Sequence, residues 1–210
     1  ITTASQLGID AESYEKLVDI FENLVLDMRP RGLVSHKQID EILAKKEFDE
    51  KRIRAVCFSS QNLDTRLYFF TNADETWLEW VWEKGLLDQI KRPAITANSY
   101  SYRLPELQYL VRMAEKKPDI VAKIIASVPI SKETLNPEVV DRFMWILSLL
   151  PIEQIKELLP KILSENWVAL MSPYHRSGYE HIKVAEKIKE SGDAEALLGF
   201  AKIILTPRSK

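Results

Sequence analysis

The sequence is short of the residues that support disulfide, metal and nucleotide chemistry. Its 210 residues include one cysteine, Cys57, together with three histidines and six glycines. A single cysteine excludes an internal disulfide. The chain also lacks a GxxxxGK[ST] phosphate-binding loop, and its histidines and cysteine are too scattered for a zinc site. We therefore expect no cofactor, no metal ion and no NTPase activity.

An excess of charge and a long apolar run are missing as well. The 29 basic and 31 acidic residues leave no net field that would attract nucleic acid or anionic lipid. No apolar run approaches the roughly 20 residues that cross a bilayer, and the first residues, ITTASQLGIDAE, do not resemble a signal peptide. We expect a cytoplasmic protein without membrane contact. Because the chain begins with Ile1, we also expect it to be a fragment or a processed product.

Helical periodicity is what the sequence has in quantity. An apolar face with steps of three and four residues predicts a first helix, and its members are Tyr14, Leu17, Val18, Phe21, Leu24, Val25 and Met28. Pro30 and Gly32 predict its end, and Ser35 is placed to cap a second helix. Asp49 is placed to cap a third helix, in which Cys57 is expected to be a buried thiol.

The next stretch, SSQNLDTRLYFF (residues 59–70), is ambiguous between a short helix and an extended segment, and we favour a helix. Asp74 precedes a compact helix that should end at Gly85 in a left-handed conformation. This helix carries three tryptophans. Trp77 and Trp80 are spaced to share one face, whereas Trp82 points about 160° away from Trp80. A thin helical layer cannot easily bury both faces, so we expect Trp80 or Trp82 to reach a partner. The alternative is that all three pack beneath the loop that follows.

That loop, KRPAITANSYSYR (residues 91–103), has no apolar period and is the longest gap between predicted helices. We expect Tyr100, Tyr102 and Arg103 to belong to the same partner-binding surface as Trp80 and Trp82, because aromatic and arginine side chains are enriched in interfaces. Tyr109 and Arg112 could bind an exposed partner as well. The alternative is that these side chains only brace the loop.

Beyond this loop the predicted helices become regular. Their starts are marked by Pro105, Pro118, Pro137 and Pro151, and the last helix should begin at Asp193 after Gly192. Pro160 is expected to bend or split its helix. Helix pairs that start near Pro105, Pro137 and His175 repeat every roughly 30 to 40 residues, which is typical of helical solenoids.

These patterns predict an all-α protein whose stacked antiparallel helix pairs form a short α-solenoid. We expect residues 1–72 to be an N-terminal helical cap and residues 73–210 to be the helical-repeat region, continuous with the cap.

Three stretches carry a resemblance to a known group of proteins: RLYFFTNADETWLEWVWEKGLLDQI, YRLPELQYLVRMAEKKPDIVAKII and NPEVVDRFMWILSLLPIEQIKELLPKI. Together they resemble the helical-repeat (HEAT/TPR-like) region of bacterial antiviral defence proteins, over roughly residues 66–205. In those proteins the region adjoins a STAND/NACHT-type NTPase or a nuclease and serves as scaffold or sensor. The resemblance implies a module of a larger defence or signalling protein, and it transfers no catalytic residue.

One pattern resembles an enzyme motif. Arg31–His36 reads RGLVSH, which is similar to the Rx4-6H motif of HEPN ribonucleases. The resemblance implies that Arg31 holds a phosphate and that His36 transfers a proton. Gly32 stands where that family usually has a polar residue, and Pro30 makes the segment look like a loop, so these can equally be ordinary loop residues.

The interpretation we favour is a non-catalytic scaffold that binds another protein or adjoining domains of a larger chain. The alternatives are a HEPN-like ribonuclease that uses Arg31 and His36, and a helical-repeat module that binds nucleic acid through a patch formed only in the fold.

Overall fold

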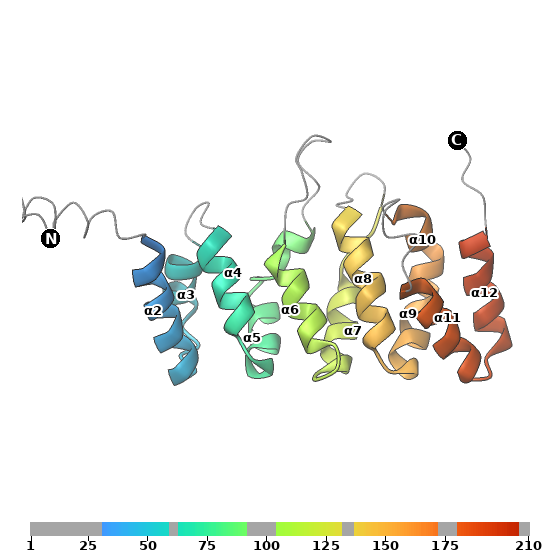
Figure 1. The fold of residues 1–210 in the computed structure, drawn as a ribbon, viewed down its shortest axis with the longest axis horizontal. Helices are drawn as coiled ribbons and strands as arrows, with labels where there is room; N and C mark the ends of the chain where they lie inside the picture. Colours follow the sequence, from blue (N-terminus) through green and yellow to red (C-terminus); the bar gives the residue numbers. More distant parts are fainter. Residues whose placement is uncertain (1–30, 59–62, 92–103, 132–136, 172–179, 206–210) are drawn as a thin grey trace, which may run out of the picture. The chain divides into compact units, whose positions relative to one another are not determined.

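A computed structural model describes residues 31–58, 63–91, 104–131, 137–171 and 180–205. These residues form eleven α-helices and two 3-10 helices, and none of them lies in a strand (Figure 1). The predicted all-α class is confirmed for this part of the chain. The chain divides into two compact units, Ile1–Phe69 and Phe70–Lys210, and the boundary falls within helix α4 (Leu63–Asn72). The helix predicted over Tyr14–Met28 lies outside the described residues.

The first unit contains α2 (Arg31–Lys45) packed against α3 (Glu50–Cys57). Ile39 and Ile42 of α2 and Ile53 of α3 are completely buried. Asp49 caps α3, as predicted, because its carboxylate accepts a hydrogen bond from the backbone N–H of Arg52 at 3.1 Å.

The predicted start of α2 was wrong. The helix begins at Arg31 and already contains Ser35, so Ser35 is not its cap. Gly32 costs only about 1 kcal/mol within a helix, which the burial of Ile39 and Ile42 offsets.

Cys57 is a buried helical thiol, as predicted. Its side chain is 1% exposed, and burial raises the pKa of the thiol to about 12. The ambiguous stretch that follows contains α4, so the helix favoured there is confirmed. Phe69 of α4 is completely buried, and the ring of Phe58 meets it edge-on at 6.3 Å.

The second unit contains the end of α4 and all the described helices that follow it. They are η2 (Glu75–Trp77), α5 (Leu78–Glu83), η3 (Asp88–Lys91), α6 (Pro105–Met113), α7 (Pro118–Ser127), α8 (Pro137–Leu149), α9 (Ile152–Ser164), α10 (Trp167–Leu170), α11 (Glu180–Glu190) and α12 (Ala194–Leu205). The predicted helix starts at Pro105, Pro118 and Pro137 are confirmed, and Pro151 occupies the cap position of α9.

Within this unit the helices pack in two series. In one, α6 contacts α8 and α8 contacts α11; in the other, α5 contacts α7, α7 contacts α9 and α9 contacts α12. Contacts of α6 with α7 and of α11 with α12 join the two series. The core between them is apolar and includes Leu107, Leu110, Val121, Ile125, Phe143, Leu147, Ile155, Ile162 and Ile188.

The predicted turns are largely confirmed. Gly85 and Gly192 have φ angles of +65° and +73°, a left-handed conformation that favours glycine. Asp193 caps α12 by accepting the backbone N–H of Ala196 at 3.0 Å. Pro160 does not split α9, which runs through it, and the buried Leu159 and Ile162 on either side anchor the helix in the core. Sequence analysis also missed α10.

Candidate protein-interaction surface

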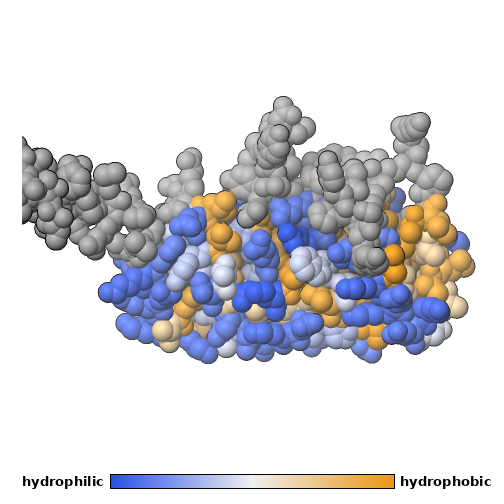
Figure 2. Space-filling model, in the orientation of Figure 1, coloured by the Kyte–Doolittle hydropathy of each residue, from blue (hydrophilic) through white to orange (hydrophobic). Residues whose placement is uncertain are grey.

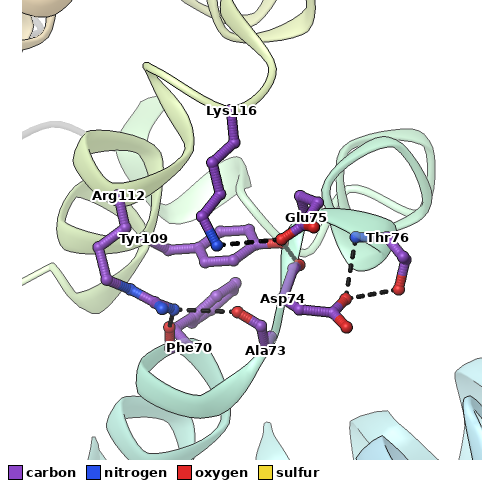
Figure 3. A network of polar contacts seen from close by, with 8 residues as sticks. All are labelled: Phe70, Ala73, Asp74, Glu75, Thr76, Tyr109, Arg112 and Lys116. Carbon is purple, nitrogen blue, oxygen red and sulfur yellow. Dashed lines mark hydrogen bonds and ion pairs between the residues drawn. The ribbon is translucent and has the colours of Figure 1, made fainter.

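The best-defined polar network of the second unit lies between α6 and the segment that links α4 to α5 (Figure 3). The Tyr109 hydroxyl donates to the backbone carbonyl of Asp74 at 2.7 Å. The Arg112 guanidinium donates to the carbonyls of Phe70 and Ala73, at 2.6 and 3.0 Å. The carbonyls of Phe70 and Ala73 lie in the last turn of α4 and just after it, where carbonyl oxygens lack a donor within the helix. We call Tyr109 and Arg112 the α6 clamp.

The two residues of the clamp differ in burial, because Tyr109 lies in the core whereas Arg112 is exposed. Tyr109 is completely buried, its ring packs 5.4 Å from that of Phe70, and the Arg112 guanidinium lies 5.6 Å from the centre of the Tyr109 ring. Burial is also the main reason that the pKa of Tyr109 is raised well above its ordinary value. Tyr109 is therefore not an exposed binding residue, as one sequence interpretation allowed. It braces residues 70–74 from inside the unit.

A second set of contacts fixes the start of η2. Asp74 caps η2, because its carboxylate accepts a hydrogen bond from the backbone N–H of Thr76 at 2.9 Å. Lys116 binds the Glu75 carboxylate at 3.1 Å. The pKa of Glu75 is lowered, first by a hydrogen bond from its own backbone N–H and then by Lys116. The α6 clamp and these contacts together position the tryptophan-bearing segment from both sides of Asp74.

The three tryptophans differ in burial. Trp77 is 1% exposed and belongs to the core, with the Trp80 ring meeting it edge-on at 5.7 Å. Trp80 and Trp82 are each half-buried. Leu78 and Val81 are the completely buried side chains of α5. Trp80 and Trp82 are thus less buried than Trp77. The alternative that all three tryptophans pack beneath the loop 91–103 concerns residues that are mostly outside the described ones, so it stays a prediction.

Tyr100, Tyr102 and Arg103 lie outside the described residues, so their membership of this surface stays a prediction. Of the loop 91–103, the structure describes only Lys91, which ends η3 and pairs with Asp88 at 2.8 Å. The surface that can be described is thus the pair Trp80 and Trp82 on α5, which we call the α5 tryptophan surface.

The RGLVSH segment has a different setting from the predicted loop. Arg31 and His36 both lie in α2, where five positions along the helix separate them by about 140°. The imidazole of His36 stacks on the ring of Tyr68 at 3.9 Å, with its Nε2 atom 3.2 Å from a carboxylate oxygen of Asp64. Tyr68 in turn donates to Asp40 at 2.9 Å, which is the first reason that the Tyr68 pKa is raised.

Sequence reasoning missed this cluster, because Asp64 and Tyr68 lie about 30 residues from His36 and no local spacing links them. A carboxylate beside an imidazole can support proton transfer. The ribonuclease hypothesis also needs the Arg31 side chain, which is outside the described part of the structure. That hypothesis stays a prediction, and RNA cleavage by the purified protein and by the variant His36→Ala tests it.

Among the described residues, no group of three or more histidine, cysteine, aspartate or glutamate side chains is arranged to hold a metal ion. None of the helices in this part of the chain is both long and apolar enough to cross a membrane. Comparison of the chain with protein-family models, curated proteins and solved structures gave no match.

Proposed function

We propose that this chain is a helical-repeat scaffold that binds another protein through the α5 tryptophan surface. The observation that carries the proposal is a contrast in burial along residues 77–82. Trp80 and Trp82 are half-buried, whereas Trp77 of η2 and Leu78 and Val81 of α5 are buried in the core. Tryptophan is the residue most enriched among interface hot spots, and a fixed ring loses little conformational entropy on binding.

The packing of the second unit supports the scaffold part of the proposal. Helices that each contact the next in two series have the contact pattern of a solenoid, in which stacked antiparallel pairs offer extended surfaces for partners. The α6 clamp holds the tryptophan-bearing segment through three backbone carbonyls, so this surface is presented by a rigid element. Rigid presentation lowers the entropy cost of association.

The biological setting is proposed on the sequence alone. The resemblance of residues 66–205 to the helical regions of STAND/NACHT-type and nuclease-associated proteins favours a role as part or partner of a bacterial antiviral defence protein. A single buried free thiol suits a reducing compartment, so we place the protein in the cytoplasm. The partner is another protein or an adjoining domain of a larger chain.

Comparative affinity capture from the native cell tests this function. Three baits are used: the unchanged chain, Trp82→Ala, and Glu79→Ala, whose side chain is exposed on the same helix. We expect at least one protein to be retained by the unchanged and Glu79→Ala baits and lost from Trp82→Ala. Capture of the same proteins by all three baits would remove the α5 tryptophan surface from the proposal, and capture of RNA alone would favour a nucleic-acid role.

A further inference from the structure

Helix α12 has an apolar face that no described helix covers. One side packs against α9, α10 and α11, with Phe200 completely buried. On the opposite side Leu198 and Leu205 are 57% and 77% exposed. Figure 2 shows hydrophobic residues gathered over this end of the second unit, at the right of the view. Leu198 and Leu205 are seven residues apart, so these two exposed leucines lie on the same face of α12.

The two exposed leucines belong to a row of residues that has the spacing of a helix-pairing seam. Ala194, Leu198, Ala201 and Leu205 are separated by four, three and four residues, so they line one edge of α12. Ala194 is exposed and Ala201 is half-buried. We call these four residues the α12 seam. Small and large side chains alternate along it.

We propose that the α12 seam pairs with the same seam of a second copy, with the two helices antiparallel. In this arrangement a register that places Leu198 against the partner's Ala201 also places Leu205 against the partner's Ala194. Every layer then combines one large and one small side chain, which fills the seam evenly. A parallel pair would instead stack leucine on leucine and alanine on alanine, leaving gaps at the alanine layers.

The charged residues beside the α12 seam also favour the antiparallel arrangement. Glu195 and Lys202 each directly follow a seam alanine, so they flank the seam along one edge. In an antiparallel helix pair the residues along corresponding edges face each other across the seam. The register above brings Glu195 close to the partner's Lys202, and two-fold symmetry repeats the pair. A surface that is complementary to itself in both shape and charge is what a symmetric dimer requires.

The seam belongs to a single helix of twelve residues, so a dimer formed through it would bury less surface area than a standard protein–protein interface. We therefore expect reversible association that increases with protein concentration. This inference does not depend on the proposed function, because it uses a different helix and a different partner.

Sedimentation velocity of the complete chain over a range of concentrations tests the dimer. We expect a monomer–dimer equilibrium that Leu198→Glu weakens at least about tenfold, because a seam carboxylate would be buried without a partner. Leu63→Glu makes the same change at a leucine that is 41% exposed in α4 and should leave association unchanged. Both variants should keep the melting temperature of the parent. A chain that stays monomeric at all concentrations, or a dimer that Leu198→Glu leaves intact, would overturn the proposal.

Charge variants test the register separately. Glu195→Lys and Lys202→Glu each place like charges opposite one another in a homodimer, and each should weaken self-association. An equal mixture of the two variants should associate again, because the heterodimer restores both opposite-charge pairs. Circular dichroism of each variant controls for loss of α12. If the two variants dimerise as well as the parent, or if their mixture associates no better than either alone, the antiparallel pairing is wrong.

Discussion

At the scale of single residues, the α6 clamp is the feature with the clearest energetic consequence. The Tyr109 hydroxyl satisfies the Asp74 carbonyl from within the core. Tyr109→Phe keeps the ring but removes this hydrogen bond, and the carbonyl retains only the backbone N–H of Trp77 at 3.3 Å. We therefore expect the free energy of unfolding to fall by about 1 kcal/mol in urea titration. Lys116→Met removes only an exposed ion pair and should have little effect. A Tyr109→Phe variant as stable as the parent would show that the clamp is not structural.

Cys57 provides a second test at this scale. Burial raises the pKa of its thiol to about 12, so the folded protein keeps the thiol protonated where an unfolded thiol, with a pKa of about 9, already ionises. The contribution of the Cys57 thiol to the free energy of unfolding is therefore fully present below about pH 9 and declines as the pH rises toward 12. We expect a thiol reagent at pH 8 to leave the native chain unmodified and to label it once it is unfolded in urea. Rapid labelling of the native chain would contradict its burial.

Residue roles were predictable where the partner is close in sequence. Asp49 was predicted as a cap, and Asp74 and Asp193 were predicted to mark helix starts, because a cap accepts an N–H only two or three residues ahead. Tyr109 was not assigned to the Asp74 carbonyl, which lies 35 residues away. Long-range pairing of this kind depends on which helices meet, and side-chain type alone does not encode it.

At the scale of helices and turns, Gly85 and Gly192 form a matched pair. Both have a left-handed φ, so an alanine at either position is strained by about 1 to 2 kcal/mol. A Cβ atom at Gly85 would also lie 2.7 Å from the Asp88 carboxylate, whereas at Gly192 nothing lies within 4 Å. We expect both alanine variants to lower the melting temperature, with Gly85→Ala the more damaging of the two. Equal loss would mean that Asp88 moves aside without cost, and no loss at either site would contradict the turn geometry.

Most helices were predictable because prolines, glycines and capping aspartates mark their ends. The exceptions are instructive. The start of α2 was misplaced because Pro30 and Gly32 suggested a loop, although a helix tolerates one glycine such as Gly32 within it. The four residues of α10 are too few to show a period, and their position depends on the burial of Trp167.

At the scale of the whole molecule, the apolar period predicted the all-α class, but it did not predict the two series of helix contacts in the second unit. Which helices meet depends on contacts such as that of α8 with α11, which are remote in sequence. The candidate surface was predictable in part. The tryptophan cluster pointed to α5, but an angular argument on one helix could not show that Trp80 and Trp82 are both half-buried. That outcome depends on how Trp77 and the neighbouring α7 pack.

The central claim is that the α5 tryptophan surface binds a protein. Its most direct test is calorimetry of the captured partner with variants at Trp82 and Trp77, together with the melting temperature of each variant. Trp82→Ala should weaken binding by on the order of 2 kcal/mol, about thirtyfold, with little loss of stability. Trp77→Ala removes a core ring and should lower the melting temperature sharply, while the folded fraction binds as before. If Trp82→Ala instead lowers stability and leaves the affinity unchanged, the half-buried Trp82 is a packing residue and the α5 tryptophan surface binds no partner.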